Sequence, residues 1–374
     1  METFYGRIKF APEGNNIAKP MVLRQIQDGE YNVVAPTKWA SSKVRHPRKQ
    51  YASAAFPSLG ARRWGCRHPG RKAEHSMLDN ISILVQAPIF AVDLLVQGLL
   101  IGGIFVLAAY GLALVWGVMN VKNLAQGELV ILGGYLAYQA TLWGIHPIVA
   151  LPVAFVLMFA LGWGLYVTII KRVVDRDMFT SLLATFGLSL LIQQSLNLVF
   201  GPEVRIAESG FGTLTMGDLS IPVIRFVSLG LAAVLAVGLV LFMRNSRMGQ
   251  AIRATAQDPR AARVLGINTD QVYAFTFALN AAICGAAGVL VAMIWNIQPF
   301  YGLVHSIRSF IIVTAAGLGN LPGVIIAGFG LGVWENYAGF VFGAEFAIAA
   351  VVGLLVVVLM IRLVQLYRLR QVVR

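Results

Sequence analysis

Uncharged apolar runs dominate the chain from Leu94 onward, and they are the feature that most restricts its fold. Seven runs contain no Asp, Glu, Lys or Arg: Leu94–Met119, Leu129–Ile170, Met178–Pro202, Phe226–Met243, Gln271–Val304, Ser309–Trp334 and Phe346–Ile361. A helix needs about 20 apolar residues to cross the hydrocarbon core of a bilayer, and the second run is long enough for two crossings. With 57% hydrophobic and 13% charged residues, the sequence predicts an all-α polytopic membrane protein.

Arginine indicates which ends of these runs face the cytoplasm, because short loops rich in Lys and Arg stay on that side. The segment Met243–Ile267 holds five arginines and one acidic residue, and Lys171–Arg176 marks a second cytoplasmic loop. The arginines after Ile361 place the C-terminal tail inside as well. Reaching that side requires one more crossing, so we expect Gly317–Gly323 to divide a run into two helices. The expected total is about eight to ten segments.

The first 76 residues differ from the rest of the chain. Residues 1–76 contain 14 Lys+Arg and 5 Asp+Glu, which is most of the net charge of +13, and they lack an apolar signal-peptide core. Two interpretations remain open: a basic, disordered extension at the membrane surface, or a start placed upstream of the true initiator Met77. We therefore expect an extension over 1–76 and a transmembrane domain over 77–374 with a cytoplasmic segment at 244–270. No folded basic face suggests binding to nucleic acid.

The cytoplasmic segment is expected to form two short helices. Ala251–Thr255 is good helix-forming sequence, and Asp258–Pro259 can cap and start a second helix at Arg260. A short cytoplasmic helix with many arginines predicts a docking element for a soluble partner. The alternative is a basic loop that only fixes the orientation of the neighbouring spans.

A polar interruption between two apolar runs is the candidate solute path. Asn120–Glu128 brings Asn, Lys, Gln and Glu between spans, where a charged side chain at the bilayer centre costs about 2.5–3.5 kcal/mol. Glu128 is expected in the first turn of the next helix, where the dipole favours a carboxylate, with Lys122 as a candidate partner. The segment is either a capped interfacial turn or a lining of the path. The candidate path residues are Asn120, Asn123, Gln126, Glu128 and Asn320.

Other polar residues carry less specific expectations. Arg308 is expected to reach the membrane interface as an anchor, and Glu335 to face water near the end of a span. The sequence has no phosphate-binding loop and no zinc-protease motif, and its five histidines do not cluster. Cys66 and Cys284 form neither a disulfide framework nor a metal cluster. We expect no enzyme activity, metal or cofactor on this chain, and any driving ATPase must be a separate polypeptide.

Five segments, in order over roughly residues 85–367, resemble the H-type permease subunit of branched-chain amino acid ABC importers. They are Gly117–Glu128, Thr185–Gln194, Arg253–Ile267, Pro299–Gly302 and Gly317–Gly323. Residues 1–76 have no counterpart in that family. The chain departs from the family at Val121–Lys122 and at Gln126, where many members have His. These departures lie at the expected path and leave the identity of the solute open.

The resemblance implies a multi-pass protein of the bacterial inner membrane that moves branched-chain amino acids. It implies four partners: a homologous M-type permease, two cytoplasmic ATPases that carry ATP–Mg, and a periplasmic solute-binding protein. Membrane lipid would surround the spans. The ATPases would dock on a coupling segment whose candidate residues are Arg253, Gln257, Asp258, Arg260, Arg263 and Gly266.

Three alternatives are kept. A related permease could import urea or short amides through the same architecture. An ion-coupled secondary transporter would need intramembrane carboxylates, of which Glu128 is the one candidate that the sequence offers. A passive channel would conduct without any partner. Whether the permease subunits form a homodimer or a heterodimer is also open.

Overall fold

The structure is a computed structural model that consists of two units, Met1–Lys72 and Ala73–Arg374. It describes residues 2–3, 6–7, 23–27, 30–35, alternate positions from 80 to 86, and 87–372 apart from 175, 209, 217–218, 318 and 344–345. In the first unit, β1 (Glu2–Thr3) pairs antiparallel with β2 (Gly6–Arg7), and β3 (Leu23–Gln27) pairs antiparallel with β4 (Glu30–Ala35). Met77 lies outside the described residues, and the disorder expected for residues 1–76 stays a prediction.

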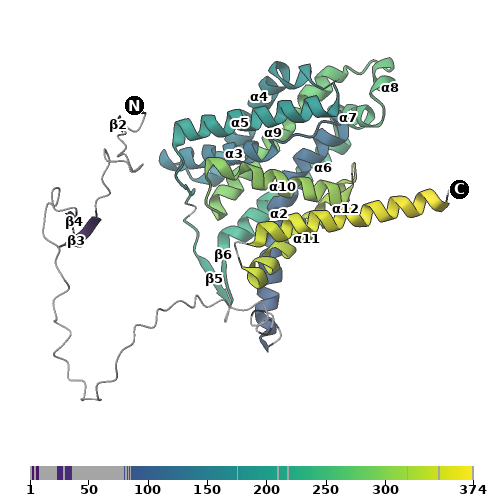
Figure 1. The fold of residues 1–374 in the computed structure, drawn as a ribbon. Helices are drawn as coiled ribbons and strands as arrows, with labels where there is room; N and C mark the ends of the chain where they lie inside the picture. Colours follow the sequence, from purple (N-terminus) through teal and green to yellow (C-terminus); the bar gives the residue numbers. More distant parts are fainter. Residues whose placement is uncertain are drawn as a thin grey trace, which may run out of the picture. The chain divides into compact units, whose positions relative to one another are not determined.

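The second unit is a bundle of helices with one short hairpin (Figure 1). The helices are α2 (Pro88–Met119), α3 (Gln126–Leu142), α4 (Pro147–Thr168), α5 (Met178–Phe200), α6 (Val223–Asn245), α7 (Arg247–Gln257), α8 (Pro259–Val264), α9 (Thr269–Ile294), α10 (Gly302–Ala316), α11 (Leu321–Phe342) and α12 (Ala347–Val372). Two 3₁₀ turns, η2 (Ile170–Arg172) and η3 (Pro299–Tyr301), and an antiparallel hairpin of β5 (Thr213–Met216) and β6 (Leu219–Pro222) complete it. The predicted all-α membrane architecture is confirmed.

Helices α2 and α9 form the centre of the bundle. Both are apolar around their whole circumference, and 94% of the most apolar window of each is buried. Such helices belong in an interior. Glycines bring their neighbours close: a methyl group on Gly102 of α2 would meet the backbone of Phe329 in α11 at 2.8 Å. Gly133 of α3 lies equally close to the backbone of Gly285 in α9. Small residues at these positions allow the helices to pack closely.

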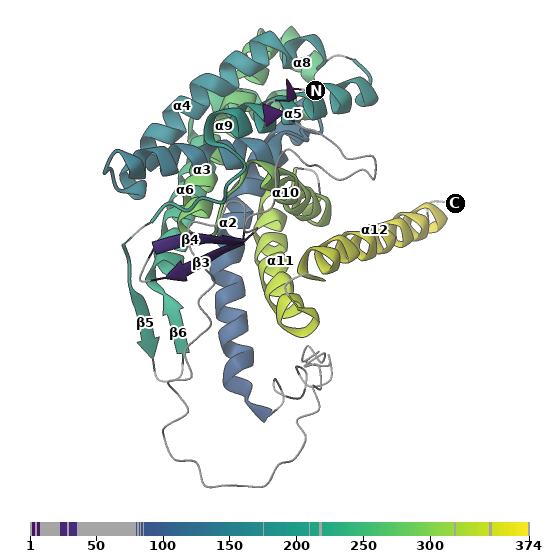
Figure 2. The same cartoon turned by 60° about the vertical axis from the view of Figure 1, so that its left-hand side comes forward.

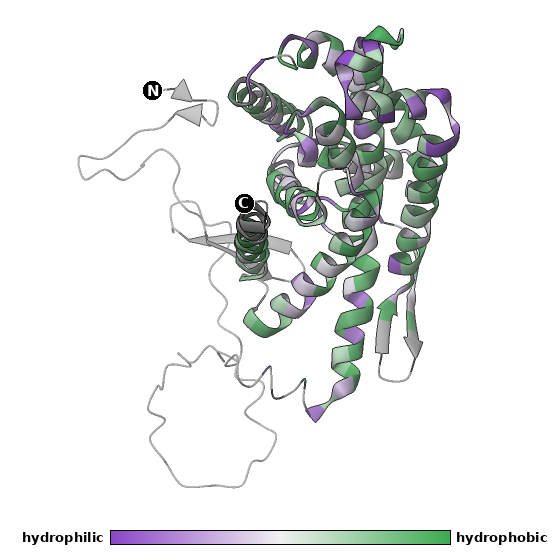
Figure 3. Cartoon of the chain, turned by 90° about the vertical axis from the view of Figure 1, so that its right-hand side faces the viewer, coloured by the Kyte–Doolittle hydropathy of each residue, from purple (hydrophilic) through white to green (hydrophobic). Residues whose placement is uncertain are grey.

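The outer helices present apolar side chains outward. Val153 and Leu157 of α4 and Val237 and Leu241 of α6 are each more than half exposed, and Figure 3 shows hydrophobic residues along these helices. Among the described residues, seven helices are long and apolar enough to cross a membrane. Adding α3, which is 17 residues long, and the apolar part of α12 gives nine segments, within the expected eight to ten.

The two ends of the bundle differ. Helices α7 and α8 lie at one end and the β5–β6 hairpin lies at the other (Figures 1 and 2). The arginines of this segment predict that the α7–α8 end faces the cytoplasm. Helix α10 ends at Ala316, and Gly317 and Gly319 then adopt positive φ angles of 92° and 77°. Asn320 caps the start of α11 by accepting from the Gly323 N–H (3.1 Å). The break predicted here is therefore confirmed.

Candidate functional site

The polar interruption predicted from the sequence is a short buried loop between α2 and α3. Helix α2 ends at Met119, and Asn120 takes up a left-handed conformation (φ 54°) at its C-cap. Asparagine tolerates this geometry better than most residues. Asn123, Gln126 and Glu128 are 0%, 0% and 1% exposed. Three of the five predicted path residues therefore lie together inside the bundle.

Hydroxyl groups from two other helices satisfy the backbone of this loop. The Thr185 hydroxyl of α5 accepts from the Leu124 N–H (3.3 Å) and is 3.1 Å from the Lys122 carbonyl. The Ser306 hydroxyl of α10 accepts from the Gly127 N–H (2.8 Å) and donates to the Leu124 carbonyl (2.9 Å). Backbone groups outside a helix need such partners at membrane depth. The loop is thus held between α5 and α10.

Amide side chains extend the polar cluster toward α9. The Gln126 Nε2 donates to the Ala108 carbonyl of α2 (2.8 Å) and to the Cys284 Sγ of α9 (2.9 Å). The Cys284 thiol in turn lies 3.6 Å from Asn280 Oδ1. Among the described residues, Gln126 Oε1, Asn123 Nδ2 and Asn280 Nδ2 are buried without a hydrogen-bond partner. Free donors and acceptors at this depth can bind a polar solute during passage.

Glu128 is buried inside the bundle, and few hydrogen bonds stabilise its carboxyl group. It lies in the first turn of α3, as predicted, and Ser189 of α5 approaches its Oε1 at 3.5 Å. Within the described part of the chain, its Oε2 has no hydrogen-bond partner. The carboxyl group packs against Gly302, the first residue of α10, where a Cβ would collide with it. The sequence suggested Lys122 as its partner, but that ammonium lies over the Trp116 ring at 5.3 Å.

The other two predicted path residues lie outside the buried cluster. Asn120 and Asn320 are exposed and serve as caps of α2 and α11. The two helix ends are neighbours, because a Cβ on Gly117 would lie 4.0 Å from the Gly319 nitrogen. The structure therefore brings these two residues to one end of the bundle, apart from Asn123, Gln126 and Glu128.

An ion pair that the sequence did not reveal joins α10 and α11. Arg308 Nε donates to Glu335 Oε2 at 2.9 Å, and Nη2 donates to Oε1 in parallel. The side chains are only 16% and 17% exposed. The expectations of an interfacial anchor and a water-facing acid were wrong, because α10 begins inside the bundle beside Glu128. The only hint in the sequence was that these two charges share one apolar region, 27 positions apart.

Two cavities flank this ion pair. One, of about 350 Å³, is bordered by Trp295, His305 and Arg308, and the other, of about 380 Å³, is bordered by Trp295 and Glu335. Trp295 stacks on Phe105 with ring centroids 5.9 Å apart, and the Arg308 guanidinium lies 4.9 Å from the Phe105 ring. The pair thus offers a cation, an anion and aromatic faces to two adjoining spaces.

The segment that the sequence predicts to be cytoplasmic forms the two expected helices, α7 and α8. Ser246 caps α7 by accepting from the Gly249 N–H (2.8 Å), so α7 begins at Arg247 rather than near Ala251. Asp258 caps α8 by accepting from the Arg260 N–H (2.8 Å) and the next amide (3.1 Å). Pro259 occupies the first helical position, as expected from its fixed φ.

All six candidate residues of the coupling segment lie on the surface of the structure. Arg253, Gln257, Asp258, Arg260, Arg263 and Gly266 are all exposed. The Arg263 Nε also donates to the Thr269 hydroxyl at the start of α9 (2.7 Å), and Gly266 turns the chain with φ 83°. Sequence reasoning missed Val264 and Leu265, which are 88% and 80% exposed at the end of α8. Their signal was two adjacent large apolar residues inside a basic cytoplasmic segment.

Comparisons with known proteins agree with this architecture. Residues 94–364 match the family model described as the permease component of a branched-chain amino acid transport system. The high-affinity branched-chain amino acid transport permease BraD of Pseudomonas aeruginosa is 30% identical over 72% of this chain and 92% of its own length. LivH of Escherichia coli K12 is 29% identical over 71% and 91%. A probable LivH of Methanocaldococcus jannaschii is 29% identical over 71% and 88%.

Proposed function

Because this chain belongs to the family of branched-chain amino acid transport permeases, we propose that it imports leucine, isoleucine and valine as part of an ATP-binding-cassette transporter. It is a multi-pass membrane protein and a permease subunit rather than an enzyme. In the proposed assembly, a homologous M-type permease completes the pathway in a bacterial inner membrane. Two cytoplasmic ATPases supply energy, and a periplasmic binding protein delivers the solute.

The observation that carries this proposal is the surface formed by α7 and α8. Val264 and Leu265 are almost fully exposed there and are flanked by the exposed Arg260 and Arg263. Large apolar side chains within a charged rim are typical of a protein interface. Arginine can also bind carboxylates on a partner in a bidentate manner. We therefore assign this surface to the ATPase.

The α7–α8 segment is mechanically connected to the bundle. Gly249 of α7 lies so close to α6 that a Cβ would be 2.6 Å from the Met243 Cα. Arg263 binds Thr269, and Lys171 after α4 pairs with Asp270 at the start of α9 (3.2 Å). A partner that moves α8 would therefore pull on α9, which carries Asn280 and Cys284 of the buried polar cluster. These contacts could transmit a movement of the ATPases through α8 and α9 to the proposed solute path.

The proposed solute path includes the polar cluster and the Arg308–Glu335 ion pair. A zwitterionic amino acid carries a carboxylate that suits Arg308 and an ammonium that suits Glu335. Ile101 and Ile348 border the two cavities and suit an apolar side chain. Urea and short amides have neither an ammonium nor a carboxylate group and would gain less from paired opposite charges. This consideration favours an amino acid over the urea alternative.

The test is uptake by the complete complex in proteoliposomes, with ATP on the ATPase side. We expect labelled leucine to accumulate only with nucleotide, and Val264→Asp combined with Leu265→Asp to reduce uptake at least tenfold and to release the ATPases. Leu142→Asp, at a 60%-exposed leucine at the opposite end of the bundle, is the matched control and should retain uptake. Accumulation of urea instead of leucine would overturn the assigned solute. Accumulation without nucleotide would overturn the ATP-driven mechanism.

A further inference from the structure

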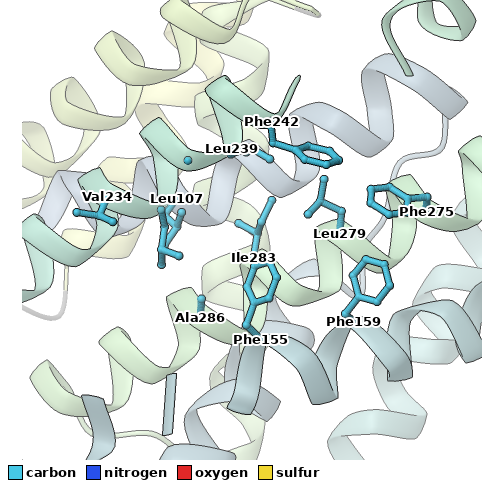
Figure 4. A pocket seen from close by; sticks show the side chains of 12 residues that line it. Leu107, Phe155, Phe159, Val234, Leu239, Phe242, Phe275, Leu279, Ile283 and Ala286 are labelled. Carbon is cyan, nitrogen blue, oxygen red and sulfur yellow. The ribbon is translucent and has the colours of Figure 1, made fainter. Parts of the chain in front are cut away.

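An apolar groove runs between α4 and α6 on the membrane-facing side of the bundle. It has a volume of about 460 Å³ and is lined by carbon side chains of α2, α4, α6 and α9. Phe155 and Phe159 of α4 stand opposite Leu239 and Phe242 of α6, with Ile283 of α9 at the floor (Figure 4). No lining residue carries a polar side chain, so the groove suits neither an amino acid nor water.

The groove is much shorter than a membrane-spanning helix, which covers about 30 Å. Its α6 wall extends from Val234 to Phe242, which corresponds to about 12 Å of helix. Val153 and Val237, outside the two walls, are 57% and 58% exposed, so the groove opens toward the bilayer. An apolar chain about one leaflet long matches the length and the apolar lining of this groove.

Cations lie at the cytoplasmic end of the groove. Arg244 is exposed two residues beyond Phe242, and Arg247 is exposed at the start of α7. On the opposite wall, α4 leads to the exposed Arg172, and the neighbouring Lys171 pairs with Asp270 of α9. Anionic lipids of the cytoplasmic leaflet are attracted to such cations near the membrane surface. The apolar groove therefore matches the acyl chain of a phospholipid, and the cations at its end match the anionic headgroup.

We propose that this groove binds one acyl chain of an anionic phospholipid from the cytoplasmic leaflet, with its phosphate held by Arg244. The lipid lies against α6, which continues through Ser246 into α7. An occupied groove thus supports the helix that carries the proposed ATPase-docking surface. One residue that lines the groove is well suited to a test, because a Cβ on Gly238 of α6 would meet nothing within 4 Å.

The experiment compares two glycine substitutions on α6. The intact chain is reconstituted in nanodiscs with phosphatidylglycerol that carries a diazirine in its acyl chain, irradiated, and mapped by mass spectrometry. Gly238→Leu fills the groove and should reduce labelling of the α4 and α6 peptides that line it at least fivefold. Gly230→Leu is the matched control, because Gly230 is equally exposed on the same helix, also has free space around it, and lies outside the groove. It should label like the wild type.

A second variant tests the headgroup. Arg244→Gln should abolish the preference for labelled phosphatidylglycerol over labelled phosphatidylcholine, while the total labelling of the groove changes less than twofold. Equal labelling of Gly238→Leu and wild type would overturn the acyl site. Crosslinking of the groove to another protein chain in the assembled transporter would assign it to that chain instead. A wild type without lipid preference would overturn the role of Arg244.

Discussion

The Arg308 guanidinium donates two parallel hydrogen bonds to the Glu335 carboxylate and so joins α10 to α11 inside the membrane-spanning bundle. Both side chains are largely removed from solvent, and the guanidinium also rests on Phe105. Charged groups at this depth are rare and are usually paired. The pair belongs to the proposed solute path, and its removal has separate consequences for stability and for transport.

Removing one member of this pair should be costly. We expect Arg308→Gln or Glu335→Gln to lower the free energy of unfolding by about 3–5 kcal/mol, because the remaining charge stays buried without its partner. The double substitution should be less destabilising than the sum of both. Unfolding in detergent micelles measures these changes. The pair of Glu203, whose side chain is 70% exposed, and the half-buried Arg205 is the control, and Glu203→Gln should cost about 0–1 kcal/mol. Additive effects at Arg308 and Glu335 would contradict the coupling.

The contact between Gly302 and Glu128 gives a steric prediction. Gly302→Ala places a methyl group into the Glu128 carboxyl and should destabilise the protein by about 1–3 kcal/mol through overpacking. Truncation by Glu128→Ala in the same chain should restore part of this loss. Gly187→Ala on α5 is the control, because a Cβ there meets nothing within 4 Å, and it should not destabilise the protein. Thermal unfolding of the three variants measures these changes in stability. An unchanged stability of Gly302→Ala would contradict the observed contact.

The Ser306 hydroxyl should be needed for the loop between α2 and α3. Ser306→Ala leaves the Gly127 N–H and the Leu124 carbonyl without their partner and should cost about 1–3 kcal/mol. Hydrogen exchange should increase at residues 124–127 in particular. Ser195→Ala removes an exposed hydroxyl that bonds only within α5 and serves as the control. Unchanged exchange in the Ser306 variant would mean that the loop is held by other contacts.

Charge reversal at the coupling segment should separate ATP hydrolysis from uptake. Arg253 is exposed on α7, so Arg253→Glu should leave unfolding unchanged. We expect it to reduce ATP-driven uptake at least tenfold in the assembled transporter while the complex still inserts into the membrane. Arg176→Glu, at an exposed arginine of the other cytoplasmic loop, is the matched control and should retain uptake. Normal uptake by the Arg253 variant would count against its assignment to the ATPase contact.

Local signals in the sequence predicted much of the fold. Apolar runs predicted the spans, Asp258–Pro259 predicted the start of α8, and Gly317–Gly323 predicted the division of α10 from α11. Each of these features depends on hydropathy over one helix or on a cap within a few residues, so neighbouring residues suffice to recognise it. The same reasoning placed Glu128 at the start of α3 and marked its segment as polar.

The pairing of distant side chains was not accessible in this way. Lys122 was the nearest candidate partner for Glu128 along the chain, yet Ser189 and Gly302 are its neighbours in space. Arg308 was assigned to the membrane interface and Glu335 to water, because each stands near the end of an apolar run. Only the packing of α10 between α3 and α11 places them together. Val264 and Leu265 were recognised only from their exposure at the end of α8 in the structure.

Hydropathy and helix signals in the sequence alone determined a polytopic bundle with a basic helical segment between two spans, and the arginine distribution predicts its orientation, since these follow from the transfer of individual segments into a bilayer. Tertiary structure decided which buried polar groups meet, which remain without partners, and where a groove stays open. Those outcomes depend on the mutual packing of helices, which joins residues far apart in the chain.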